Sequence, residues 1–161
     1  MTKVACLTLV VVAVVPLGAS PSIAEQATQQ IAVSKPVSYA RVYTDAESAS
    51  HFAEDTLSFQ LVDYAPPAPP ISVSQVFGAE NVSFISSPLG WHGDWHPAPR
   101  RQFVLVLVGE LEVEVSDGEV RRFPAGSHCL VEDTVGTGHA SRVVGQQRVL
   151  AAAIPLVDGT K

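Results

Sequence analysis

The stretch from Gln102 to Val131, QFVLVLVGELEVEVSDGEVRRFPAGSHCLV, decides the fold class. Apolar residues run without interruption from Phe103 to Val108 and then recur at every second position in Leu111–Val115. These are the patterns of a strand buried on both faces and of a strand buried on one face. Asp117 and Gly118 separate two such runs and favour a type I′ hairpin turn. The stretch therefore predicts successive antiparallel strands.

Further strand patterns lie on both sides of this stretch, and no run with a helical period comes between them. The strand candidates are residues 41–43, 82–85, 103–108, 111–115, 119–123, 129–131 and 149–156. Many short strands separated by turn residues are typical of sandwiches, barrels and jelly rolls. We expect an all-β fold, a single jelly-roll-like barrel, with antiparallel pairing throughout.

The N-terminal residues 1–24, MTKVACLTLVVVAVVPLGASPSIA, have the pattern of a secretory signal peptide. Lys3 precedes an apolar run from Val4 to Val15, which is shorter than a membrane span requires, and Pro16 ends it. We expect cleavage after Ala24, a secreted or periplasmic protein, and no membrane span once the leader is removed. A retained N-terminal anchor is the alternative.

Residues 25–70 are predicted to form an N-terminal extension with edge strands and a proline-rich linker, followed by the barrel in residues 71–161. Within the extension, residues 64–70 read YAPPAPP. Four prolines in seven residues favour an extended polyproline conformation across the surface, at the boundary of the barrel.

The charge balance argues against nucleic acid as a partner. The chain carries a formal net charge of −6, which becomes −7 when Lys3 leaves with the signal peptide. No basic stretch offsets this balance, so a small-molecule ligand is the expected partner.

The densest group of polar side chains is WHGDWH, residues 91–96. Because side chains alternate along a strand, His92, Asp94 and His96 are expected to share one face. Trp91 and Trp95 would take the other face, where they pack against a neighbour or stack on a ligand.

With these residues the chain resembles the cupin superfamily, and small bacterial cupin-domain proteins in particular. The family's first motif runs Gly, five residues, His-x-His, three or four residues, Glu, six residues, Gly. Asp94-x-His96 stands at the paired histidines, and Gln102 with Gly109 reproduces the spacing from Glu to Gly. A second, degenerate motif runs from Pro124-x-Gly126 to His139. The resemblance covers residues 71–157 and implies a cupin barrel, or double-stranded β-helix.

The resemblance also implies a metal site. Asp94, His96 and His139 would bind Fe(II), Mn(II) or Zn(II), with Gln102 adding an amide oxygen and His92 as a further ligand. The sequence departs from the family pattern, since Asp94 replaces the first histidine and Gln102 replaces the glutamate. A metal-free polar plug inside the barrel is the alternative.

Two functions follow from these readings. The first is a metal-dependent enzyme of the dioxygenase or isomerase class, in which Arg100 or Arg101 orients an anionic group of a small organic substrate. The second is a non-catalytic module that binds a small molecule without metal. A structural homodimer with a vestigial pocket is a third reading.

Overall fold

A computed structural model describes residues 32–157, so the predicted leader and its cleavage site lie outside the described residues. These residues form twelve β-strands and no helix, which confirms the all-β prediction. The strands are β1 (Val37–Thr44), β2 (Ser50–Leu57), β3 (Phe59–Val62), β4 (Ile71–Ser74), β5 (Ser83–Ser87), β6 (His92–His96), β7 (Gln102–Val108), β8 (Glu110–Val115), β9 (Val120–Pro124), β10 (His128–Val131), β11 (His139–Val144) and β12 (Val149–Pro155). Within residues 32–157 there is thus no helix of the length and hydropathy that crossing a membrane requires.

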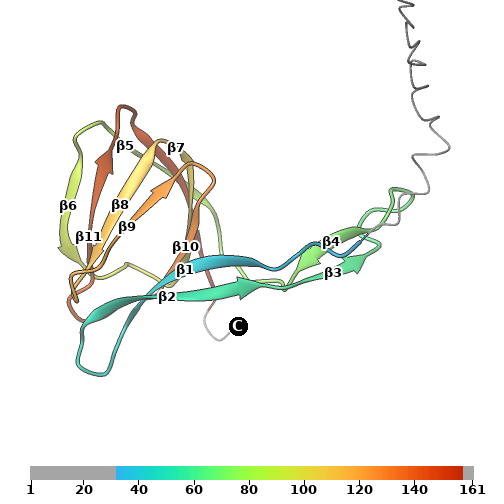
Figure 1. Cartoon of the computed structure of the whole chain (residues 1–161), viewed down its shortest axis with the longest axis horizontal. Coiled ribbons are helices and arrows are strands. Elements are labelled where there is room, and N and C mark those ends of the chain that lie inside the picture. Colours follow the sequence, from blue (N-terminus) through green and yellow to red (C-terminus); the bar gives the residue numbers. More distant parts are fainter. Residues whose placement is uncertain (1–31, 158–161) are drawn as a thin grey trace, which may run out of the picture. The chain divides into compact units, whose positions relative to one another are not determined.

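The strands form two main sheets and one small one (Figure 1). The six-stranded sheet has the order β2-β1-β10-β7-β12-β5, the four-stranded sheet has the order β6-β11-β8-β9, and β3 pairs with β4. The last eight strands pair in a nested way: β5 with β12, β6 with β11, β7 with β10 and β8 with β9, all antiparallel. This nesting is the jelly-roll, double-stranded β-helix arrangement that the sequence predicted.

The prediction of antiparallel pairing throughout is wrong at one strand pair, and the two main sheets do not close into a continuous barrel. No strand ladder joins the two main sheets within the described part of the chain, so the barrel is not closed. In addition, β1 runs parallel to β10, with Ala40 opposite Cys129. The alternation of apolar and polar residues sets which face of a strand is buried but carries no information on the direction of its neighbour.

The N-terminal extension contributes to the same sheet as the jelly roll, because β1 and β2 continue it beyond β10. The proline-rich residues 64–70 are not an extended surface segment, as predicted, but the loop that joins β3 to β4. The amide of Ala68 donates a hydrogen bond to the carbonyl of Ala65 over 2.9 Å, which is the bond of a β-turn. Pairing of Val62 with Ile71 forces the chain to reverse between them.

The hairpin between β8 and β9 is present, but its turn is not of type I′. Gly118 has φ +92°, whereas Asp117 does not have a positive φ. The amide of Gly118 donates to the carbonyl of Val115 at 2.9 Å, and the amide of Val115 donates to the carbonyl of Glu119 at 3.0 Å. This is a type I turn followed by a glycine bulge, the three-residue alternative to the expected two-residue loop.

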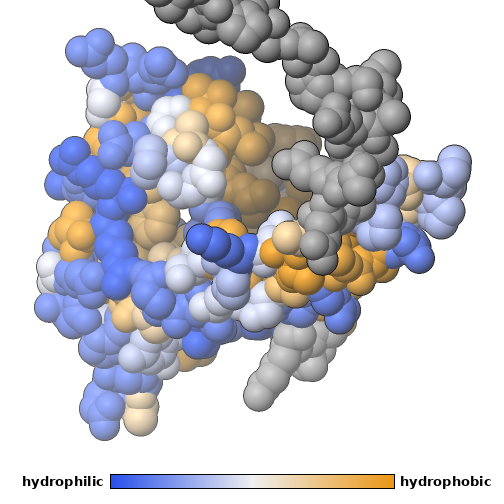
Figure 2. Space-filling view, turned by 45° about the vertical axis from the view of Figure 1, so that its right-hand side comes forward, coloured by the Kyte–Doolittle hydropathy of each residue, from blue (hydrophilic) through white to orange (hydrophobic). Residues whose placement is uncertain are grey.

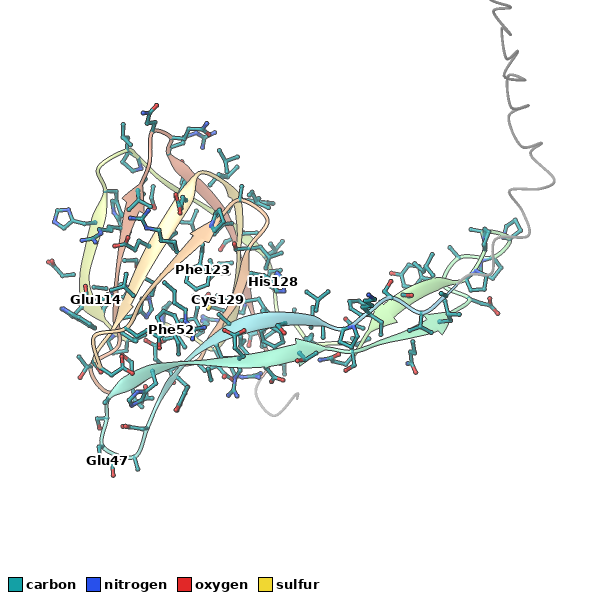
Figure 3. All side chains as sticks on the ribbon, viewed as in Figure 1. Glu47, Phe52, Glu114, Phe123, His128 and Cys129 are labelled. Atoms are coloured by element: carbon teal, nitrogen blue, oxygen red, sulfur yellow. The ribbon has the colours of Figure 1, made fainter. Side chains whose placement is uncertain are left out.

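The main core lies between the two large sheets and includes Phe52, Phe123 and Cys129 (Figure 3). Strand β7 is apolar from Phe103 to Val108, and its residues pack in clusters on both faces of the sheet. Val106 faces this core, while Phe103 packs in a second cluster on the other face of the sheet, with Tyr39 and Leu130. Burial raises the pKa of the Cys129 thiol to about 12, so it stays protonated and serves as a packing side chain.

Candidate functional site

A cavity of about 290 Å³ lies between the sheets, beside β6, β7 and β11. Most of its wall is apolar: Ile85, Trp91, Pro99, Val104, Leu111, Val131, Val149 and Ala151. The polar lining side chains are Ser87, His96, Gln102, His139 and Ser141. Three of the five predicted metal-site residues, His96, Gln102 and His139, therefore meet in this cavity.

The two histidines are neighbours on paired strands. His96 ends β6 and lies opposite His139, which begins β11, and their ring centroids are 4.8 Å apart. The Nδ1 of His96 lies 2.6 Å from the backbone oxygen of Asp94, and the Nδ1 of His139 lies 2.6 Å from Oδ2 of Asp133. A carbonyl or carboxylate oxygen accepts, so each Nδ1 carries the hydrogen, and in the neutral imidazole each Nε2 keeps a lone pair for a ligand.

Asp133 is a site residue that the sequence reasoning did not single out. It is fully buried, it accepts the hydrogen bond from His139, and its Oδ1 has no hydrogen-bond partner among the described residues. One feature of the sequence points to Asp133: it lies shortly after the buried strand that ends at Val131 and six positions before His139. Nothing in that pattern distinguishes it from Glu132, whose side chain instead pairs with Arg41 and Arg101.

Gly138 holds the start of β11 against the end of β6. It has φ +72°, and a Cβ at this position would overlap the backbone of His96 and Pro97. Only glycine permits both this conformation and this approach. The close contact fixes His139 beside His96.

A β-bulge in β6 separates the predicted ligands. Gly93 lies opposite Ser141 and His96 lies opposite His139, so two residues, Asp94 and Trp95, oppose the single residue Ala140. The extra residue breaks the alternation of the strand.

As a result, His96 lines the cavity, while His92 and Asp94 line a separate groove on the outer face of the four-stranded sheet. The prediction that His92, Asp94 and His96 share one face is wrong for this reason.

The two tryptophans also lie on different surfaces of the sheet. Trp91, expected on the outer face, lines the cavity and packs on Gly93, where an added Cβ would come within 2.9 Å of the indole Cη2. Trp95 lies in the outer groove with 45% of its surface exposed. The cavity and the outer groove therefore each contain one of the two tryptophans.

The arginines predicted to bind substrate do not line the cavity. Arg100 pairs with Glu80 at 2.7 Å, and Arg101 pairs with Glu132 at 2.7 Å. Each of the two guanidinium groups therefore pairs with a carboxylate of the protein itself.

The donor set does not fit the metal site that the family resemblance implies. In the cavity it comprises two imidazoles and one amide, and the Asp94 carboxylate is on the other face of β6. Within residues 32–157, no three His, Cys, Asp or Glu side chains are grouped so that they could hold an ion. Catalytic zinc sites use three such protein ligands, and carboxylates are among the main ligands of manganese and non-heme iron.

The nested pairing from β5 to β12, with a cavity between the two sheets, is the jelly roll found in cupins. The fold is of the cupin type. No family model matches the chain. No curated protein matches it either.

Three solved structures are similar to this chain. A conserved protein of unknown function from Streptococcus pyogenes is 22% identical over 46% of this chain, with a TM-score of 0.37, and the match spans 62% of that protein's length. A cupin 2 conserved barrel domain protein from Salinispora arenicola is 19% identical over 64% of this chain and 76% of its own, with a TM-score of 0.41. The cupin domain of Cnp3 from Schizosaccharomyces pombe is 13% identical over 76% of this chain and 84% of its own, with a TM-score of 0.38.

Proposed function

We propose that the cavity binds a small, largely apolar organic molecule directly through His96 and His139, without a metal ion. The observation that carries this proposal is the paired arrangement of the two imidazoles. Both use Nδ1 to bond protein oxygens, so both have only Nε2 to offer to a ligand. A largely apolar wall with a few placed polar groups, here including two fixed acceptors, is the usual composition of a small-molecule site.

The aromatic side chain and the charges of the cavity wall indicate the shape and the charge of the ligand. Trp91 provides a flat apolar surface, which suits an aromatic or other planar ring. The lining residues include no lysine or arginine to balance an anion, and the buried Asp133 lies behind His139. A neutral molecule with hydroxyl or amine donors matches the two Nε2 acceptors best. A volume of about 290 Å³ is at the small end of ligand pockets.

Binding is tested with the Trp95→Phe variant, in which Trp91 is the only tryptophan of the chain. Neutral phenols and aromatic amines, with benzoates as an anionic comparison, are titrated while Trp91 fluorescence is followed. We expect neutral donors to bind and His96→Ala or His139→Ala to raise Kd about tenfold or more, which is the loss of about 1.4 kcal/mol of binding free energy. His92→Ala is the matched control, because His92 is on the same strand outside the cavity.

Equal loss of binding in His92→Ala and His96→Ala would overturn the assignment of the cavity, as would the absence of any quenching across the panel. Elemental analysis of the purified protein tests the metal-free part separately. Stoichiometric iron, manganese or zinc that disappears in His96→Ala would replace this proposal with the metal-dependent enzyme, for which the hydrogen bond between His139 and Asp133 is also suited.

We also propose, from residues 1–24, that the protein acts outside the cytoplasm. Mass spectrometry of the exported protein tests this proposal. We expect a chain that starts at Glu25, and an intact N-terminus would contradict the proposal.

A further inference from the structure

A second groove, of about 210 Å³, lies on the outer face of the four-stranded sheet and shares no histidine or tryptophan with the cavity. Its floor consists of two cross-strand rows. One row runs from His92 across Arg142 and Glu112 to Arg122, and the other runs from the bulge residues Asp94 and Trp95 across Ala140 to Glu114. Val113 and Val115, which alternate with Glu112 and Glu114 along β8, face the core.

The first row is fixed by ion pairs. Glu112 is only 5% exposed although it lies on the outer face, because Arg122 and Arg142 cover it. The Nε of Arg122 donates to Oε2 of Glu112 at 2.9 Å, and Arg142 donates to Oε1. The guanidinium of Arg142 is therefore held at the edge of the groove, with donors to spare for a ligand.

The second row is open. Ala140 is the smallest side chain of the row and leaves a depression between its neighbours. Trp95 borders this depression with 45% of its surface exposed. Asp94 and Glu114 also line it, and neither is in an ion pair within the part of the chain that the structure describes. The exposed indole offers a ligand a flat apolar surface, and the two carboxylates offer it hydrogen-bond acceptors.

We propose that this groove binds a neutral saccharide. The C–H face of a pyranose ring is apolar and would lie on the indole of Trp95. Asp94 and Glu114 would accept hydrogen bonds from its hydroxyl groups, and Arg142 and His92 would donate to their oxygens. The two unpaired carboxylates disfavour an anionic sugar. The bulge is what makes the site, because it turns Asp94 and Trp95 outward at the same level of the sheet.

The test uses the Trp91→Phe variant, in which Trp95 is the only tryptophan. Cellohexaose, maltohexaose and chitohexaose are titrated up to about 10 mM, roughly ten times the Kd of a weak site of 1 mM. We expect at least one of them to change Trp95 fluorescence. In calorimetry, Trp95→Ala should weaken that sugar's binding about tenfold or more, Trp95→Tyr should restore most of it, and Asp94→Asn or Glu114→Gln should weaken it several-fold.

Three results would overturn the proposal: no response to any of the three sugars, unchanged binding in the folded Trp95→Ala variant, or tighter binding of polygalacturonate than of the neutral sugars. His96→Ala is the control for independence from the cavity and should leave sugar binding unchanged. If His96→Ala abolished sugar binding while Trp95→Ala retained it, the sugar would bind in the cavity, and this assignment would be refuted.

Discussion

Asp133 is buried completely and makes a single side-chain hydrogen bond, the one that orients His139. Its Oδ1 has no partner among the described residues, so the carboxyl group depends on His139 as much as the imidazole depends on Asp133. Such a pair is asymmetric in its energetics, since a buried polar group that loses its partner retains the full cost of its desolvation.

We predict that Asp133→Ala changes the free energy of unfolding in opposite directions in the native protein and in the His139→Ala variant. In the native background, Asp133→Ala leaves the Nδ1 of His139 without a partner and should destabilise the fold by about 1–3 kcal/mol. In the His139→Ala background, it removes a carboxyl group that has lost its only side-chain partner, and should be stabilising. Urea unfolding of the four proteins measures this cycle. Additive effects of the two substitutions would contradict it.

At the scale of single residues, the sequence predicted the cavity side chains that lie next to strand ends. His96, Gln102 and His139 occupy positions that the two motifs mark by spacing. It failed for His92 and Asp94, because their direction depends on a bulge formed with β11, and a contact between distant strands is not encoded in local alternation.

Among the elements, two turns are joined at one end of the molecule by a histidine. His51, in β2, bonds Asp45 of the β1–β2 turn through Nε2 at 2.8 Å and Asp117 of the β8–β9 turn through Nδ1 at 2.6 Å. Both ring nitrogens face carboxylates, so the surroundings of His51 favour the imidazolium, in which both nitrogens donate. The six-stranded and four-stranded sheets, which no ladder joins in the described residues, are connected here by side chains.

This arrangement predicts a pH dependence of stability. Hydrogen bonds to Asp45 and then Asp117 raise the pKa of His51 above its ordinary value of 6.5. The contribution of His51 is therefore complete below pH 6.5 and is lost as the pH rises through the folded-state pKa. Hydrogen bonding lowers the pKa of Asp45 below 3.8, so its contribution is lost only as the pH falls through that lower value.

The measurement is the difference in urea-unfolding free energy between the native protein and His51→Gln from about pH 5 to pH 9. We expect the native protein to be the more stable at the acid end and the difference to shrink as the pH rises. His92→Gln serves as the comparison. A difference that stays constant across the range would show that the contact of His51 with Asp45 and Asp117 is not ionic.

For the whole molecule, the sequence predicted the class and the jelly-roll topology because strand patterns, turn residues and motif spacing all agree along residues 82–156. It did not predict how residues 37–74 are used. Their strands are short and mixed in pattern, and only pairing with distant partners decides that β1 joins β10 in parallel while β3 and β4 form a sheet of their own.

Stability should accordingly be uneven across the molecule. Strands β3 and β4 pair only with each other, and Leu61 and Ile71 remain 39% and 49% exposed. An isolated two-stranded sheet is marginal in water. We predict that hydrogen exchange of the β3 and β4 amides is fast by local opening, whereas β7 and β10 exchange only by global unfolding. Equal protection of all four strands would contradict this.

Figure 2 shows hydrophobic surface beside hydrophilic surface on one side of the molecule. A depression of about 520 Å³ lined by residues that include Phe77, Phe103 and Leu107 lies on the outer face of the six-stranded sheet, which therefore differs in character from the outer face of the four-stranded sheet.

The bulge in β6 also gives a means of redesigning the molecule by length rather than by side chain. If one residue were deleted before His92 and β6 paired without the bulge, Trp95 alone would oppose Ala140, and Asp94 would move from the level of Ala140 to that of Ser141. The carboxylate and the imidazole of His92 would then face the two histidines of the cavity. A change of one residue in length would thus convert a pocket with two histidines into a four-ligand site without creating any new functional group.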